Sequence, residues 1–458
     1  MAKPGRHHRR SEDTPPGPRG FTLVELLLAA ALSLVVMGAL AGLFGLFGRA
    51  IKQSEATMNL GALMRSAAWQ LRQDLAGVTC PVNPWLAPEA NLGYFELIEG
   101  PANDTTYAFD AQGLPTLNLA ADTDDMLLFT TQSLAGDFVG RFEGKTIESP
   151  YAEVAWFCRP AATQPVAGTT VYDLHRRQLL VMNYLGRSTL VNNALPLATD
   201  RAGCDLSLCS GTISGQGQVL LPNSLGDLTK RENRFMRSGY SFVMESGANR
   251  SVAVQTFPHA FPVDSTQHAI SEAALDGTRR ASEDIVLTNV IAFDVRVFDP
   301  QAAVSTAGGT LERVPGDPGY TAPASGTALG AYVDLGWGGG GPGVRTDAFP
   351  PAGKTAFQSA GVAVTDSPRR TTLPRPTYDT WSRHYEFNGV DDDGDGVVDE
   401  AVQGVDGADT DTYPENTLDT ETSPPYPVRL RGLEVRLRCY EPSSQQVRQV
   451  TIRHSFVK

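Results

Sequence analysis

The chain has 458 residues, 19% charged and 41% hydrophobic, so it is long enough for one large or two ordinary domains and too apolar to be mainly disordered. Its formal net charge of −13 argues against a nucleic-acid-binding surface. The 45 glycines and 31 prolines favour strands, turns and long loops over a helical bundle.

A basic segment precedes a long apolar one at the N-terminus. Residues 1–20 carry five basic and two acidic side chains and are rich in proline near their end, which predicts a disordered leader. Residues 21–47 contain one charge, Glu25. A run of this length crosses a hydrocarbon core of about 30 Å as a helix. The positive flank predicts that the N-terminus is cytoplasmic and that the rest of the chain is outside.

Two simpler explanations of residues 21–47 account for less of the pattern. A secretory signal peptide has a shorter apolar core and a small-residue cleavage site after it, and neither feature is present. An ordinary signal anchor explains the length and the orientation but leaves Glu25 unexplained. An acidic residue at the centre of a membrane helix costs roughly 2.5–3.5 kcal/mol, so such residues usually mark a function.

Residues 20–25, with the sequence GFTLVE, resemble the processing motif of type IV prepilins and type II secretion pseudopilins. The resemblance implies that a membrane prepilin peptidase cleaves between Gly20 and Phe21 and that Phe21 is then N-methylated. It also implies that Glu25 neutralises the terminal amine of a neighbouring subunit in a filament. Opposite charges are tolerated in an apolar bundle only as a pair, which explains why this carboxylate is kept.

Two features of the N-terminus depart from the family pattern. The leader is longer than the shortest leaders of the family, and glycines stand where many major pilins carry a helix-loosening proline. These residues are Gly38, Gly42, Gly45 and Gly48. Each glycine either weakens the helix, by about 1 kcal/mol, or permits close packing between helices.

The helix is expected to continue beyond the membrane as an amphipathic segment. Apolar residues recur at helical spacing between Met58 and Ala76, and Gly77 is a plausible stop. A single helix over residues 21–76 would be about 84 Å long, and its outer part should pack one face against the outer domain. The apolar positions are Leu60, Leu63, Met64, Ala67, Leu71 and Leu75.

The remainder of the chain, residues 77–458, is predicted to form a mainly antiparallel β domain, which makes the fold class α+β. Alternating or continuous apolar segments bounded by turn residues predict the strands. The strand segments are residues 126–130, which follow an acidic turn, 153–157, 178–182, 285–298, 433–437 and 447–456. Loop-rich insertions are expected at about 195–282 and 301–425. This part resembles J-type minor pseudopilins of type II secretion and W-type minor pilins.

An acidic loop at residues 391–400 is similar to calcium-binding loops. Its alternating oxygen ligands are of the type that Ca²⁺ prefers, and Gly396 permits a tight turn. The EF-hand spacing is not kept, because it requires a glutamate at Val402. The alternative is a solvated acidic turn without metal. The candidate ligands are Asp391, Asp393, Asp395, the carbonyl of Val397, Asp399 and Glu400.

The five cysteines form no metal-binding pattern. Cys204 and Cys209 bracket a short loop, which suggests a disulfide in an oxidising compartment, and the alternative is five reduced thiols. Residues 140–146, GRFEGKT, fall one residue short of a phosphate-binding loop, so they are better explained as a hairpin turn. Neither a zinc-protease motif nor a nucleophile elbow is present, and we do not expect an enzyme.

These patterns predict a minor pseudopilin or pilin-like subunit of the bacterial inner membrane with a periplasmic C-terminal domain. Its expected partners are prepilin peptidase and methyltransferase, other pseudopilins or pilins, and an inner-membrane assembly platform. The bulky domain suggests a position near the filament tip. Glu25 argues against the terminal position itself, because the last subunit has no neighbour beyond it whose amine this carboxylate would neutralise. The alternative is a surface-displayed binding or adhesion module that uses the same anchor.

Overall fold

The computed structural model describes part of the chain, and all statements below concern that part. It comprises residues 20–84, 86–99, 108–109, 115–116, 121–142, 145–165, 170–182, 205–213, 217–229, 233–234, 263–264, 269–270, 283–305, 313–315, 317, 320, 329–337, 377–380 and 428–457. Residues 1–19 and the predicted calcium loop at 391–400 lie outside it.

One long helix, α1 (Leu23–Ala76), begins two residues after Phe21 and ends at the position expected from the sequence. The chain divides into two compact units, Met1–Ala56 and Thr57–Lys458. In the first unit, every described side chain up to residue 55 is exposed. By length and composition, α1 is able to cross a membrane.

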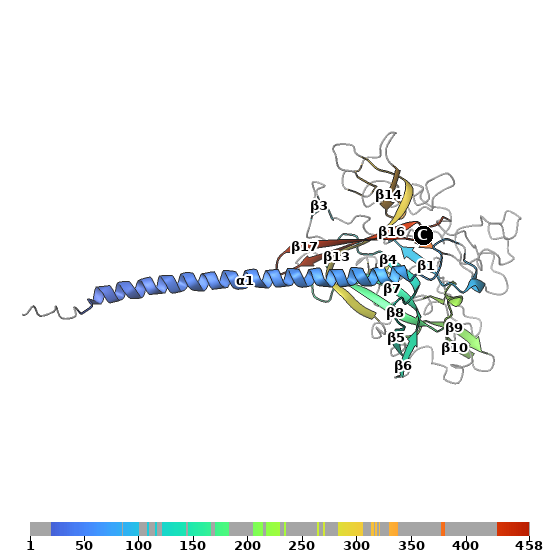
Figure 1. The fold of residues 1–458 in the computed structure, drawn as a ribbon, viewed down its shortest axis with the longest axis horizontal. Helices are drawn as coiled ribbons and strands as arrows, with labels where there is room; N and C mark the ends of the chain where they lie inside the picture. The colour runs from blue at the N-terminus through green and yellow to red at the C-terminus, as the bar shows by residue number, and fades with distance from the viewer. Residues whose placement is uncertain are drawn as a thin grey trace, which may run out of the picture. The chain divides into compact units, whose positions relative to one another are not determined.

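The second unit is built on a nine-stranded sheet in which every strand pair is antiparallel. The strand order is β15-β1-β4-β7-β8-β13-β16-β17, with β14 paired to β13. Figure 1 shows these strands beside the C-terminal part of α1. The bounds are β1 (Phe95–Ile98), β4 (Met126–Gln132), β7 (Tyr151–Pro160), β8 (Tyr172–Val181), β13 (Glu283–Ala303), β14 (Leu329–Val333), β15 (Thr377–Asp379), β16 (Gly432–Glu441) and β17 (Gln446–Ser455).

Four two-stranded pairs and two short 3-10 helices complete the described elements. The pairs are β2 (Ala108–Phe109) with β3 (Pro115–Thr116), β5 (Phe138–Phe142) with β6 (Lys145–Ser149), β9 (Leu208–Ile213) with β10 (Gly217–Pro222), and β11 (Val263–Asp264) with β12 (Ala269–Ile270). The β5–β6 pair confirms the hairpin predicted for residues 140–146. The 3-10 helices span Pro88–Ala90 and Asp227–Thr229.

All six predicted strand segments coincide with strands of the main sheet, although the segments 178–182 and 447–456 each extend one residue beyond the strand end, and the expectation of an α+β fold is confirmed. The prediction that residues 301–425 form a loop insertion was wrong in part. β14 and β15 both come from that segment and both join the main sheet. They are only five and three residues long, so their apolar pattern was too short to identify them.

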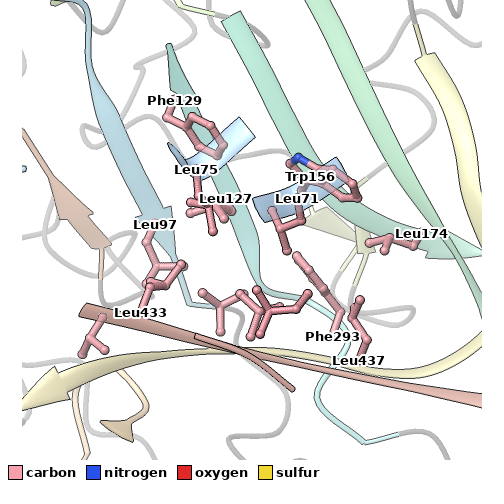
Figure 2. Packing of buried hydrophobic residues seen from close by; sticks show 14 of the residues in the cluster. Leu71, Leu75, Leu97, Leu127, Phe129, Trp156, Leu174, Phe293, Leu433 and Leu437 are labelled. Atoms are coloured by element: carbon pink, nitrogen blue, oxygen red, sulfur yellow. The ribbon is translucent and has the colours of Figure 1, made fainter. Parts of the chain in front are cut away.

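The main core lies between one face of α1 and one face of the sheet. Figure 2 shows Leu71 and Leu75 of α1 close to Leu127, Phe129 and Trp156 of the sheet. Alternate side chains of β4 point to this face because strand residues alternate between faces. Five of the six apolar positions predicted for the outer helix are buried, namely Leu60, Met64, Ala67, Leu71 and Leu75. Leu63 is 52% exposed, so its assignment to the buried face was wrong.

The opposite face of the sheet is also covered. Met126 and Leu128 of β4 pack there with Leu225 and Leu228, which flank and enter the second 3-10 helix. Both faces of the central strands are therefore buried, and this explains why β4 reads as a continuous apolar run.

A buried charge fixes the outer end of α1 on the sheet. Both carboxylate oxygens of Asp74 accept hydrogen bonds from Arg176 on β8, at 2.7 and 2.8 Å. The indole N–H of Trp156 on β7 donates to the same carboxylate at 2.9 Å. One helix residue thus joins two neighbouring strands, and each charged group has a partner.

Candidate functional site: processing and assembly at the N-terminus

The predicted cleavage position lies immediately before α1. Gly20 and Phe21 have no helical or strand structure, and both are exposed, Phe21 to 83%. A Cβ atom built at Gly20 would meet no other heavy atom within 4 Å. The peptide bond between these residues is therefore open to a peptidase within the described chain.

Thr22 and Glu25 close the start of α1 with reciprocal hydrogen bonds. The Thr22 backbone N–H and its hydroxyl donate to the Glu25 carboxylate, at 2.9 and 3.0 Å. The Glu25 backbone N–H donates in return to the Thr22 hydroxyl oxygen at 3.3 Å. This arrangement is a capping box, which satisfies two N–H groups that a helix start leaves without partners.

The capping box gives Glu25 a role within its own chain. Thr22 is not among the residues predicted for the site, although the spacing from Thr22 to Glu25 is the sequence signature of this cap. A carboxylate in the first helical turn also interacts favourably with the helix dipole. Glu25 is consequently held at the helix start, one turn after the terminus that cleavage at Gly20 would create.

The apolar residues after Glu25 form an exposed surface along the first unit. Leu26, Leu32, Val35, Phe44 and Phe47 are all more than half exposed. A contiguous apolar surface of this length requires lipid or other apolar helices around it. The glycines noted above have open space around them in the described chain, so they contribute no packing within it.

A group of buried carboxylates in the second unit is a further possible ligand site. Glu99, Asp122 and Asp334 each place an oxygen within 4.8 Å of the others, and the same holds for Asp122, Asp125 and Asp294. Burial raises the pKa of Asp122 and of Asp125 well above the usual range, and neighbouring carboxylates raise both further. The sequence indicates an acidic turn before residue 126 but gives no sign of its partners.

The other predicted site residues lie mostly outside the described residues. This applies to the calcium loop at 391–400 and to Cys204, and the side chain of Cys209 is not described. Cys80, Cys158 and Cys439 are free and buried. Burial raises the pKa of Cys80 and of Cys439 to about 12 and that of Cys158 well above its usual value, so these thiols stay protonated.

A family model described as the prokaryotic N-terminal methylation motif matches residues 17–41. No curated protein and no solved structure gives a significant match to the chain. The motif, the long apolar helix and the antiparallel sheet together have the organisation of a type IV pilin-like protein. The motif implies processing by a prepilin peptidase and assembly with other pilins, and the apolar helix implies single-pass membrane anchoring.

Proposed function

We propose that this protein is a minor pseudopilin or minor pilin that is cleaved after Gly20, methylated on Phe21 and assembled into a type II secretion pseudopilus or a type IV pilus. The observation that carries the proposal is Glu25, the single charge in an otherwise apolar run that follows an accessible cleavage position. A membrane anchor alone gains only a helix cap from this residue, which an uncharged glutamine is also able to supply, whereas a helical filament gains a charged partner for each buried terminal amine.

The outer domain supports a minor rather than a repeated subunit. Its nine-stranded sheet is much larger than a helix anchor needs, and bulk of this kind is difficult to repeat along a tightly packed shaft. The proposed orientation places the domain in the periplasm, as the basic leader favours. An adhesion or binding module on the same anchor is the competing function, and the described residues contain no observation that favours it.

Two variants separate the two roles of Glu25, as a helix cap and as the charged partner of a neighbouring subunit's amine. Glu25→Gln removes the charge but keeps a side chain that is able to cap, whereas Thr22→Ala removes the cap and keeps the charge. If Glu25 neutralises a neighbouring amine, Glu25→Gln should still be cleaved and methylated but should enter sheared or cross-linked filaments at least tenfold less than wild type. Thr22→Ala should assemble nearly normally.

The reverse pattern would contradict the assembly role. Normal assembly of Glu25→Gln together with a defect in Thr22→Ala would reduce Glu25 to a helix cap. Deleting the gene and measuring protein secretion, adhesion and transformation in the same strain would show whether the subunit acts in a secretion pseudopilus or in a pilus. A secretion defect alone indicates the pseudopilus, and a loss of piliation or transformation indicates the pilus.

A further inference from the structure

Five buried carboxylates from four separate segments meet in the second unit. Glu99 follows β1, Asp122 and Asp125 precede β4, Asp294 lies on β13, and Asp334 follows β14. We call these residues the acidic cluster. Asp122 belongs to both of its groups of close oxygens, so it lies at the centre.

Most of the acidic cluster is held in place by known contacts. The backbone N–H of Val295 donates to Asp125 at 2.7 Å, and that of Leu335 donates to Glu99 at 2.9 Å. Arg296 contacts Asp294 at 3.0 Å and Asp334 at 3.1 Å. The fixed positions of these four side chains resemble a preformed shell rather than a solvated acidic patch.

Asp122 differs from the other members. It is 0% exposed, and neither of its carboxylate oxygens has a hydrogen-bond partner among the described residues. Its backbone is fixed on β13, because the Phe293 N–H donates to the Asp122 carbonyl at 2.7 Å and the Ala121 N–H donates to Ile291 at 2.8 Å. A buried polar group without a partner is costly, and a buried carboxylate is more so.

We propose that the acidic cluster binds a divalent cation, Ca²⁺, with Asp122 as the central ligand. Oxygen ligands on opposite sides of one Ca²⁺ are separated by about 4.6–5.2 Å, twice the usual calcium–oxygen distance. The oxygens of each group lie within 4.8 Å of one another, so the oxygens of one group are close enough to share such an ion. The cation supplies the partner that both oxygens of Asp122 lack.

The ligand chemistry selects the type of metal. Both groups consist of carboxylates alone, which suits a hard cation, whereas zinc and copper sites normally include histidine or cysteine. Mg²⁺ keeps several waters and a strict octahedron, so it is less suited to a fully buried shell. Ca²⁺ accepts six to eight oxygens in variable geometry and fits several convergent carboxylates.

The bound ion would act as a structural cross-link. It would join the end of β1, the start of β4, the middle of β13 and the turn after β14, which are distant in sequence. This role concerns the folding of the second unit and does not depend on filament assembly. The site is also distinct from the predicted loop at 391–400, so the two require separate tests.

The test uses the full-length protein in detergent, stripped with EGTA, reloaded with Ca²⁺ and analysed for bound calcium per chain. Asp122→Asn keeps the shape of the side chain and removes its charge. It should bind one Ca²⁺ fewer than wild type, and Ca²⁺ should raise its melting temperature less. Asp137→Asn, at an exposed position, should bind as wild type does. Asp393→Asn tests calcium binding by the 391–400 loop independently.

A second measurement covers the case in which Asp122→Asn does not fold. Trp337 lies close to the cluster, since its backbone N–H donates to the Asp334 carbonyl at 3.3 Å. Tb³⁺ bound in the cluster should therefore be sensitised by this indole. Trp337→Phe should lose most of the emission, whereas Trp381→Phe, near the 391–400 loop in sequence, should keep it.

The proposal is overturned if folded Asp122→Asn binds as much calcium as wild type. It is also overturned if Asp122→Asn is unfolded and Trp337→Phe leaves the Tb³⁺ emission unchanged. Either result would mean that the acidic cluster binds no calcium through Asp122.

Discussion

Asp74 shows how a single residue determines the attachment of α1 to the sheet. It lies on the buried face of the helix between Leu71 and Leu75, where an apolar residue is expected. The surrounding sheet explains the exception, because Arg176 and Trp156 both donate to its carboxylate. Removing one partner of such a pair leaves an uncompensated charge in the core.

Asp74→Ala should lower the free energy of unfolding of the outer domain by about 3–5 kcal/mol, because the buried Arg176 guanidinium would lose the carboxylate with which it is paired. Chemical denaturation of the full chain in detergent, followed by tryptophan fluorescence, measures the change. Arg72→Ala is the matched control, since Arg72 lies two residues before Asp74 on the exposed side of the helix, and it should change stability by less than about 0.5 kcal/mol. Equal effects of the two substitutions would contradict the role given to Asp74.

At the scale of elements, the end of α1 depends on a close approach to β4. The Gln132 N–H donates to the Gly77 carbonyl at 2.7 Å, and the Thr131 hydroxyl donates to the Asp74 carbonyl at 2.8 Å. A Cβ atom at position 77 would overlap the Gln132 carbonyl oxygen and the Thr131 hydroxyl. Glycine is therefore required there by space, and not by a left-handed backbone conformation, because Gly77 has no positive φ.

Two glycine substitutions on or beside α1 should have opposite effects on the stability of the outer domain. Gly77→Ala should destabilise the outer domain by about 1–3 kcal/mol, because backbone atoms of β4 would have to move. At Gly61, inside the helix, an added Cβ would meet only the Arg65 guanidinium at 3.4 Å. Gly61→Ala should therefore stabilise by about 0.5–1 kcal/mol. Thermal unfolding of both variants measures the difference, and a stabilising Gly77→Ala would refute the close approach.

Sequence patterns predicted the long elements and missed the short ones for a physical reason. Residues 433–437 alternate strongly enough to identify β16, whereas β15 has three residues and exists through its pairing with β1. Leu63 fits the helical spacing but lies off the buried face. Helical spacing identifies the residues on the apolar face of a helix, but it does not show how much of that face the sheet covers.

The same contrast applies to the sites. Residues 20–25 were predictable because the motif is contiguous and its chemistry is local. The acidic cluster was not, because the chain brings together Glu99, Asp122, Asp294 and Asp334 only through the register of the sheet and its turns. The acidic turn before β4 could be recognised in the sequence, but its burial could not.

The whole molecule consists of two units with different requirements. The first presents an exposed apolar helix that begins with a capped, accessible terminus and needs lipid or other helices around it. The second has its own core on both faces of a sheet. A pilin-like subunit requires both, and in the function we propose, processing at Gly20 allows the first unit to leave the membrane for a filament.

Mass spectrometry of the mature N-terminus tests this claim most directly. The protein should be purified from cells with an active prepilin peptidase and, as a control, from cells that lack it. The chain should begin at N-methylated Phe21 in the first case and at Met1 or Ala2 in the second. An uncleaved N-terminus in peptidase-active cells, or cleavage after residue 47, would contradict this claim and leave a simple membrane-anchored or secreted β protein.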